Sequence, residues 1–329
     1  MKVCIYGAGA IGGLIGSRLA AAGKCTVSAV ARGATLDALR EHGFRLRESQ
    51  QEGGSLWSAP VNASDDPKAL GVQDVVVIAV KGPALSAVAQ TIAPLLGPDT
   101  VVLPAMNGVP WWFGKGVPAL EAAPLQSIDP GGRIASAIAS EHVVGCVVHA
   151  SASTPQPGLV EHKMGRGLIV GEPAGGESAR TRRLAGLLTQ AGFQVTVSPD
   201  IRRDIWYKLW GNLTMNPVSA ITGATIDRVL DDPLVLEFCS AAMREAAAIG
   251  ARIGCAIAQS PEDRHAVTRK LGAFKSSMLQ DVEASRTIEL DAIVGVVREM
   301  AQRLGIATPN IDVLLGLTRL YARVHGLYP

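Results

Sequence analysis

The sequence predicts an α/β fold in which an N-terminal doubly wound domain precedes an all-α C-terminal domain. An apolar strand over Lys2–Tyr6 leads directly into a glycine-rich turn and a helical run over 14–22. Strand-like and helical segments then alternate, which is typical of a parallel sheet covered by helices. From Ile201 onward the pattern is helical almost throughout. We therefore expect domains over 1–198 and 199–329.

The bulk composition excludes several classes of protein. Hydrophobic residues make up 48% of the chain and aromatic residues only 4%, so the core must consist mostly of Ala, Val, Leu and Ile. The net charge of +2 predicts neither a nucleic-acid nor a membrane partner. We expect no transmembrane helix and no signal peptide, and hence a cytoplasmic location. Five scattered cysteines without a CxxC pair indicate reduced thiols, and the histidine spacing predicts no metal site.

The turn after the first strand has the spacing G-x-G-x-x-G of the Rossmann fingerprint. Its first glycine permits the tight turn, its second lets the backbone approach a pyrophosphate, and its third lets the helix pack on the strand. Free amides at the helix N-terminus face the phosphates. We therefore predict a dinucleotide cofactor bound by Gly7, Ala8, Gly9, Ala10, Ile11 and Gly12.

The end of the second strand, Thr26–Val30, predicts which dinucleotide binds. An NAD site usually has an acidic residue there to hold the ribose 2′-OH. This chain has Arg32 instead, and no acid before Asp37. A guanidinium can clamp a 2′-phosphate, which a carboxylate would repel. We therefore predict NADP(H), with a solvated loop arginine and NAD(H) as the alternative.

Two further strands end in polar residues. The apolar run over 74–80 is typical of a strand buried on both faces, and Lys81 follows it. The strand over 100–103 is followed by Asn107–Gly108. Because ligands bind at the carboxyl ends of the strands in such sheets, we expect Lys81 and Asn107 at the site. A surface charge and a plain Asn-Gly turn are the alternatives.

The other elements of the first domain follow from periodicity. We predict helices at 35–42, 85–96 and 177–191, and a variable hairpin between 43 and 62. We expect the β-like segments at 143–152, 158–162 and 167–170 to add antiparallel strands to the sheet, with a last strand at 194–197.

In the second domain we expect helices at roughly 201–215, 227–229, 234–254, 262–285, 287–304 and 309–322. Lys208, Asn212 and Asn216 lie four residues apart, so a helix places them on one stripe. Pro217 should end or kink that helix. The stripe is either a solvated helix edge or part of a site. Exposed apolar stripes on the later helices would suit a homodimer.

The stretch over 275–291 is dense in polar residues for a helical region. Ser277 and Glu289 are twelve residues apart, so they can converge only if a bend or a cap lies between them. The alternative is a charged, solvated face. Spacing leaves open which of these side chains face a ligand: Ser277, Asp281, Arg286, Glu289 and Asp291.

Taken together, these motifs resemble the ketopantoate reductase (2-dehydropantoate 2-reductase) family over essentially the whole chain. The resemblance rests on the glycine turn, Val80–Lys81, Met106–Gly108, Trp206–Pro217, and Ser276–Asp281 with Glu289–Asp291. It implies NADPH-dependent reduction of a 2-oxo acid, ketopantoate above all, to a 2-hydroxy acid in pantothenate biosynthesis. It also implies a Rossmann domain, a helical domain and an active site in the cleft between them.

Residue by residue, the resemblance implies these roles. Lys208 matches the catalytic lysine and Glu289 its carboxylate partner. Asn212, Asn216 and Ser277 match substrate-side polar groups. Asn107 and Lys81 match positions near the nicotinamide, and Arg32 matches the 2′-phosphate position. We also expect Asn107 to contact the substrate and Glu289 to contact the cofactor.

The chain departs from the family pattern at Ile226, where an additional substrate-binding Asn is common, and it has extra residues at 48–60 and 110–135. The pair Trp111–Trp112 in the second of these could line the site. Three alternatives follow: a paralogue acting on a different 2-oxo acid, a 3-hydroxyacid or 6-phosphogluconate-type dehydrogenase, and a non-catalytic NADPH sensor.

Overall fold

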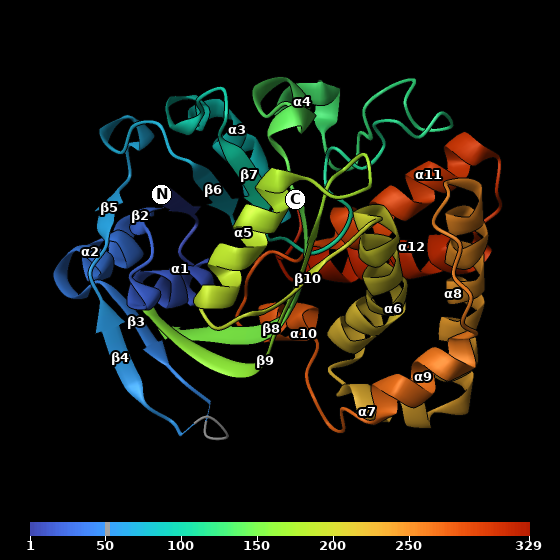
Figure 1. The fold of residues 1–329 in the computed structure, drawn as a ribbon. Helices are drawn as coiled ribbons and strands as arrows, with labels where there is room; N and C mark the ends of the chain where they lie inside the picture. The colour runs from blue at the N-terminus through green and yellow to red at the C-terminus, as the bar shows by residue number, and fades with distance from the viewer. Residues whose placement is uncertain (50–52) are drawn as a thin grey trace. The chain divides into compact units, whose positions relative to one another are not determined.

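A computed structural model describes residues 1–49 and 53–329 (Figure 1). The chain divides into two compact units. The first comprises Met1–Met106 and Arg133–Asp204, and the second comprises Asn107–Gly132 and Ile205–Pro329. The prediction of a parallel-sheet N-terminal part and an all-helical C-terminal region is confirmed. The chain passes from the first unit to the second at Asn107 and returns after Gly132. The second unit therefore includes a segment from the middle of the chain.

The first unit is built on a parallel sheet in the order β5-β2-β1-β6-β7. All four residues of β6, Val-Val-Val-Ile, are buried, as expected for a strand covered on both faces. Its flanking strand β1 pairs in register with both β2 and β6. The sheet consists of β1 (Lys2–Tyr6), β2 (Thr26–Val30), β5 (Asn62–Ser64), β6 (Val75–Ile78) and β7 (Val101–Pro104).

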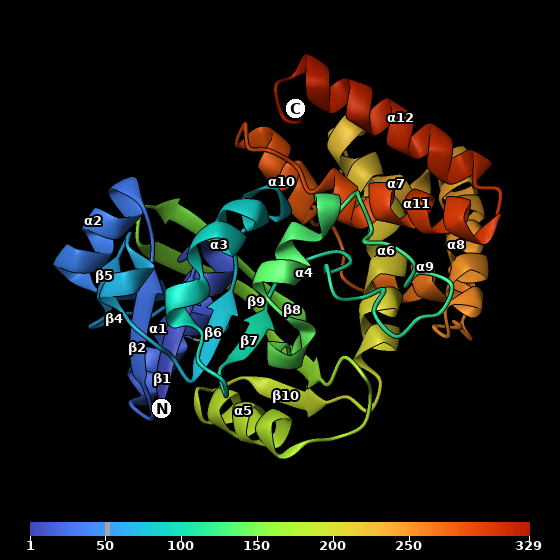
Figure 2. The same ribbon diagram turned by 90° about the horizontal axis from the view of Figure 1, so that it is seen from above.

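Helices cover this sheet. The connection from β1 to β2 runs across the sheet in one direction, and the connection from β6 to β7 runs in the other. Because such crossovers are right-handed, the helices in these two connections cover opposite faces of the sheet. α1 (Ala10–Ala22) packs on β1 and β2 and also contacts the second sheet, which Figure 2 shows from above. Among the described residues between 33 and 142, the first unit also has α2 (Gly33–His42), α3 (Leu85–Thr91), α4 (Arg133–Ala137) and short 3-10 turns at Pro67–Ala69, Gly82–Ala84, Ala93–Leu95 and Ser140–His142. The 3-10 turn at Pro130–Gly132 belongs to the second unit.

A second sheet has the order β10-β9-β3-β4, with β8 paired to β9. The prediction that the segments at 143–170 form antiparallel strands is confirmed by the pairing of β8 with β9, but these strands lie in the second sheet, and an isolated bridge between Val143 and Val102 connects them to the first. Two of them belong to one long strand, β9, which pairs in parallel with β3 from the predicted hairpin. The strands are β3 (Phe44–Arg47), β4 (Leu56–Ala59), β8 (Gly145–Gln156), β9 (Leu159–Gly171) and β10 (Gln194–Val197), with α5 (Ala179–Gln190) beside β10. Residues 50–52 of the 48–60 segment lie outside the described residues.

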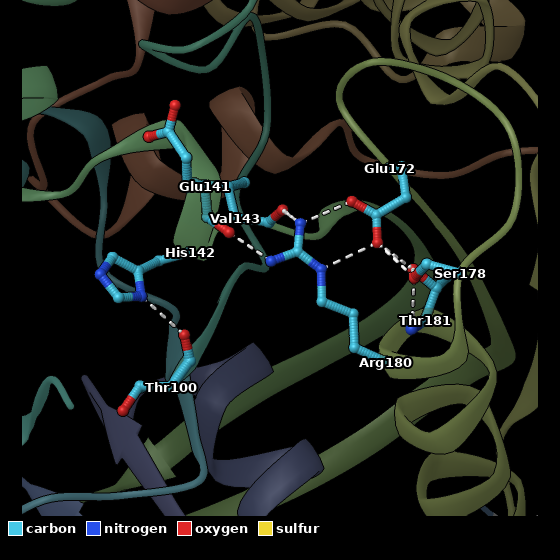
Figure 3. Close-up of polar contacts among 8 residues, drawn as sticks. All are labelled: Thr100, Glu141, His142, Val143, Glu172, Ser178, Arg180 and Thr181. Carbon is cyan, nitrogen blue, oxygen red and sulfur yellow. Dashed lines mark hydrogen bonds and ion pairs between the residues drawn. The ribbon is translucent and has the colours of Figure 1, made fainter. Parts of the chain in front are cut away.

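An ion pair joins the start of α5 to the turn after β9 (Figure 3). Nε and Nη2 of Arg180 donate to the two carboxylate oxygens of Glu172 at 2.9 and 2.6 Å, a bidentate arrangement. The hydroxyls of Ser178 and Thr181 donate to the same carboxylate at 2.5 and 2.7 Å. These donors, Arg180 first, lower the pKa of Glu172 from 4.5 to about 2.

The same guanidinium also reaches the segment before β8, because it donates to the carbonyls of Glu141 and Val143 (Figure 3). A pocket of about 530 Å³ opens beside it, at the N-terminal ends of β1, β6 and β7. Its lining mixes acidic Asp74 and Asp99 with basic Arg183. Ligands of doubly wound sheets bind at the other, carboxyl ends of the strands, so this ion-pair cluster is structural.

The second unit is helical, with α6 (Ile201–Thr222), α7 (Ile226–Asp231), α8 (Pro233–Arg252), α9 (Pro261–Arg269), α10 (Ser277–Glu283), a π-helical turn η7 (Asp291–Gly295), α11 (Val296–Leu304) and α12 (Pro309–Val324). The single helix predicted over 262–285 is wrong, because α9 and α10 are separate helices. Ser260 and Ser276 cap these two helices individually. In the described residues no helix combines the length and hydrophobicity needed to cross a membrane.

Of the two alternatives predicted at Pro217, an end or a kink of α6, the end is wrong. The helix continues through Pro217 to Thr222. A proline inside a helix loses one backbone hydrogen bond, at a cost of about 3 kcal/mol. Here residues 213–220 are all buried, so their packing offsets that cost.

Candidate functional site

The glycine turn has the geometry that a dinucleotide phosphate needs. Gly7 has φ +95°, and a Cβ there would lie 2.6 Å from Cγ1 of Val80. At Gly12 a Cβ would lie 2.0 Å from the Gly7 carbonyl oxygen, so the helix approaches the strand as closely as the motif predicts. At Gly9, the N-cap of α1, no atom lies within 4 Å of the Cβ position. The backbone is therefore open at the position where the fingerprint places the pyrophosphate, and the cofactor fits.

Arg32 and Lys81 follow the two strands that flank β1. Arg32 is the exposed N-cap of α2, directly after β2. Lys81 is the partly exposed N-cap of the 3-10 turn after β6. Together with Gly7, these residues extend the carboxyl ends of three adjacent strands. The first unit thus places two cations on the edge of the sheet where an anionic dinucleotide would bind.

The second unit brings Lys208 and Asn107 into contact. Lys208 lies on α6, and its Nζ donates to Oδ1 of Asn107 at 2.8 Å. Both side chains are half-buried. The contact joins residues that are 101 positions apart in the chain. It therefore exists only because Asn107–Gly132 belongs to the unit that contains α6.

Asn212 and Asn216 share α6 with Lys208, as the four-residue spacing predicts. Asn212 is half-buried, whereas Asn216 is only 6% exposed. Among the described residues, Nδ2 of Asn216 has no hydrogen-bond partner. A buried amide donor without a partner is costly, so an acceptor supplied by water or by a ligand would stabilise Nδ2 of Asn216.

Ser277 and Glu289 lie on either side of a break in the helices. α10 begins at Ser277, whose side chain is exposed, while the preceding Ser276 caps the helix. The helix ends at Glu283, and Ser285 has φ +52°. A bend therefore lies between Ser277 and Glu289 in the chain. Glu289 is half-buried between Ile288 and Leu290, which are 1% and 0% exposed.

Several other residues singled out from the sequence belong to the core. Ile226 is 1% exposed and packs in an apolar cluster with Met215 and Val218. Trp111 and Trp112 are buried, at 6% and 2% exposure. These side chains therefore stabilise the second unit. In the described parts of the chain, no group of three or more His, Cys, Asp or Glu side chains could hold a metal ion.

Sequence reasoning missed the residues that position Asn107. Gly108 has φ +81°, and the next amide, of Val109, donates to the carbonyl of Ala292 at 2.8 Å. The Asn-Gly dipeptide predicts a turn, but nothing in the sequence near it indicates that the turn docks on η7. The sequence pattern therefore identifies Gly108, but it does not identify η7 as the element that this turn contacts.

Comparison with known protein families matches two family models in succession. Residues 3–175 match "Ketopantoate reductase PanE/ApbA", and residues 200–322 match "Ketopantoate reductase PanE/ApbA C terminal". A 2-dehydropantoate 2-reductase of Mesorhizobium japonicum is 42% identical over 329 residues, covering 100% of both chains. A 2-dehydropantoate 2-reductase of Halobacterium salinarum is 26% identical, covering 98% of this chain and 99% of that one.

Solved structures agree with this assignment. A candidate ketopantoate reductase from Ralstonia solanacearum MolK2 has a TM-score of 0.94 at 56% identity, covering 99% of each chain. A PanE/ApbA family ketopantoate reductase from Ralstonia eutropha JMP134 has a TM-score of 0.83 at 26% identity, covering 99% of this chain and 100% of that one. The chain, with its glycine turn and its Lys208–Asn107 pair, is an oxidoreductase that belongs to the ketopantoate reductase family.

Proposed function

We propose that the protein reduces ketopantoate to pantoate with NADPH. The observation that carries the proposal is the Lys208–Asn107 contact, which holds an ammonium group in a defined place on a helix that also bears Asn212 and Asn216. Family membership supports the reaction, because the 42% identical relative is a 2-dehydropantoate 2-reductase. The substrate is a 2-oxo acid, so the site must hold a ketone and a carboxylate together.

The first unit supports NADPH as the reductant. Residues 7–12 supply the backbone turn for the pyrophosphate, and Arg32 supplies a cation where the 2′-phosphate would lie. Lys81 adds a second cation on the neighbouring strand. A D-mandelate dehydrogenase of the same fold, 22% identical, was solved with NADH, so the choice between the two cofactors needs a direct test.

The mechanism assigns each polar group one task. Bound NADPH supplies a hydride to the carbonyl carbon. As negative charge grows on the carbonyl oxygen, Lys208 donates a hydrogen bond to it and then its proton, which yields the hydroxyl group. Oδ1 of Asn107 accepts from Lys208 at 2.8 Å and so fixes where the ammonium points. The proton transferred leaves Lys208 neutral until solvent reprotonates it.

The remaining residues hold the substrate. The unpaired Nδ2 of Asn216 is a donor for a substrate oxygen, and Asn212 lies one turn before it. From their match to the family's residues, we assign Ser277 to the substrate carboxylate, and Glu289 to a substrate hydroxyl or to Lys208. Ile226 packs in the core, so it offers no amide to the substrate. A 2-oxo acid other than ketopantoate is therefore the second candidate.

The test is NADPH oxidation with ketopantoate and a panel of 2-oxo acids that differ in branching and in the terminal hydroxyl. We expect ketopantoate to give the highest kcat/KM. A higher value for another 2-oxo acid would assign the protein to a paralogous reductase. Oxidation of 3-hydroxy acids, or NADPH binding without any turnover, would overturn the proposal.

We also propose that the protein forms a homodimer through α12. This helix exposes four apolar side chains at helical spacing, Val313, Leu317, Leu320 and Val324, with exposures of 53% to 74%. The stripe is symmetric about its centre, so an antiparallel copy would pair 313 with 324 and 317 with 320. A ketopantoate reductase from Staphylococcus aureus with the same fold is dimeric. Sedimentation velocity should show a dimer that Leu317→Glu dissociates, and a monomeric wild type would contradict this.

A further inference from the structure

The segment that carries Glu289 is held on both sides by the residues after α12. Directly before Glu289, the amide of Ile288 donates to the carbonyl of Leu327, at an N···O distance of 3.1 Å. Two residues after Glu289, a carboxylate oxygen of Asp291 accepts from the hydroxyl of Tyr328 at 2.7 Å. Ile288 and Leu327 are buried, at 1% and 3% exposure. We call these two contacts the 327–328 clasp.

The clasp also connects to the Lys208 site. Asp291 begins the π-helical turn η7, in which its carbonyl accepts from the amide of Val296 instead of the usual residue one position earlier. The next carbonyl, of Ala292, accepts from the amide of Val109 at 2.8 Å. Val109 lies two residues after Asn107, whose Oδ1 accepts from Lys208. The turn η7 thus connects Tyr328, through the contacts of Asp291 and Ala292, to the segment whose Asn107 binds Lys208.

Tyr328 is itself fixed. Burial, followed by the bond to Asp291, raises the pKa of Tyr328 to about 12, so at neutral pH the hydroxyl keeps its proton and donates. The guanidinium of Arg323 lies over the Tyr328 ring at 5.5 Å, a cation–π contact, and its Nε donates to the carbonyl of Pro329 at 3.1 Å. The ring therefore stays in place if only its hydroxyl is removed.

We propose that Tyr328 is a positioning residue, which acts through Asp291 and Ala292 to hold Glu289 and the Asn107–Lys208 pair in place for reduction. This inference rests on the proposed function only for its catalytic consequence. The contacts themselves are independent of the substrate. Supporting residues of this kind affect rate because a misplaced group loses its alignment with the reacting atoms.

The test compares Tyr328→Phe with Tyr321→Phe in the full-length protein. Tyr321 lies on α12, and its hydroxyl has no hydrogen-bond partner among the described residues, so it is a matched control. Hydrogen–deuterium exchange reports on the segments 107–110 and 288–293. Steady-state kinetics with ketopantoate give kcat and KM, and fluorescence titration gives the Kd of NADPH.

We expect Tyr328→Phe to speed exchange in both segments and to lower kcat roughly tenfold. The Kd of NADPH should stay within about twofold, and Tyr321→Phe should change nothing. Asp291→Asn keeps an oxygen that accepts from Tyr328, so it should retain more activity than Asp291→Ala. The double variant Asp291→Ala/Tyr328→Phe should be no slower than Asp291→Ala, because both changes remove one contact.

Unchanged exchange in Tyr328→Phe would overturn the clasp, and raised exchange with unchanged kcat would overturn its role in catalysis. If the decreases in kcat of the two single variants added up in the double variant, Asp291 and Tyr328 would not act through one shared hydrogen bond. If the wild type reduces no 2-oxo acid, the proposed function fails. The exchange measurement then still decides whether Tyr328 holds the two segments.

Discussion

At the scale of single residues, the proposed chemistry depends on the ammonium group of Lys208. Its hydrogen bond to Oδ1 of Asn107, at 2.8 Å, uses one of the three N–H donors of the ammonium group and fixes where that group lies. Lys208→Ala should lower kcat by roughly 10²- to 10³-fold, the usual cost of losing one oriented donor to a developing oxyanion. Stopped-flow single turnovers at saturating NADPH measure this directly.

The Kd of NADPH is the control for that variant, because Lys208 lies on α6 and the glycine turn lies on the other unit. It should stay unchanged. Turnover by Lys208→Ala at the wild-type rate would contradict the role of Lys208 as proton donor.

Arg32 should decide between the two nicotinamide cofactors. It is exposed at the N-cap of α2, and it forms no ion pair among the described residues. Arg32→Ala should weaken NADPH binding by about 1.5–3 kcal/mol, as expected for hydrogen bonds to a charged group. NADH lacks the 2′-phosphate, so its Kd is the internal control and should not change. Equal weakening of both cofactors in isothermal titration would show that Arg32 acts through the fold.

At the scale of elements, the turn that follows β7 tests how tightly Asn107 is held. In Gly108→Ala the new Cβ would lie 2.3 Å from the carbonyl oxygen of Ala292, with φ at +81°. Strain and overpacking should together lower the free energy of unfolding by about 3 kcal/mol and lower kcat as well. Denaturant unfolding and steady-state assays measure the two effects.

Gly223→Ala is the matched control, since Gly223 has φ +71° and no atom lies within 4 Å of its Cβ position. Gly223→Ala should lower the free energy of unfolding by only about 1 kcal/mol and leave kcat unchanged. If the two alanine variants behaved alike, the close approach of Gly108 to η7 would have no energetic weight.

Elements with strong local signals are predictable from the sequence, and those that depend on distant partners are not. The buried run of β6 and the glycine turn before α1 were both correctly predicted, because burial on two faces and a tight turn leave local patterns. Pro217 misleads because packing around α6 outweighs a local preference. The pairing of β3 with β9 has no local signal at all, since the strands lie more than a hundred residues apart.

The candidate site divides in the same way. The spacing of Lys208, Asn212 and Asn216 predicts their common helix face, which α6 provides. That Asn107 binds Lys208, and that Tyr328 binds Asp291, depends on tertiary contacts across 101 and 37 positions. Residue types can therefore be proposed from the sequence, whereas the groups that orient them require the structure.

At the scale of the whole molecule, we expect low pH to reduce the stability that the ion-pair cluster around Glu172 gives to the fold. Its carboxylate is only 13% exposed, and its pKa of about 2 lies below the ordinary 4.5. A lowered folded-state pKa adds stability above pH 4.5, roughly 3 kcal/mol, which is lost as the pH falls from 4.5 toward 2. Glu172→Gln should therefore unfold at lower denaturant concentration than wild type at pH 7, and the difference should shrink below pH 4.5.

Glu177→Gln is the comparison variant, because Glu177 and Arg182 form an exposed pair with exposures of 55% and 60%. Exposed ion pairs contribute about 0–1 kcal/mol to the free energy of unfolding. The denaturant midpoint of Glu177→Gln should therefore match that of wild type at every pH. A Glu172→Gln penalty that persisted unchanged at pH 3 would show that packing, and not the charge, stabilises this part of the molecule.

The path of the chain through Asn107–Gly132 limits how the protein can be recombined with its relatives. The backbone passes between the units three times, after Met106, Gly132 and Asp204. Within the second unit, Glu299 accepts from the amides of Gln126 and Ser127 at 2.8 Å, and Arg303 donates to the carbonyl of Ala123 at 2.6 Å. A chimera joined once, near residue 198, would combine a foreign 107–132 segment with a native α11. Only exchanges with breakpoints at all three passages would transfer the first unit whole.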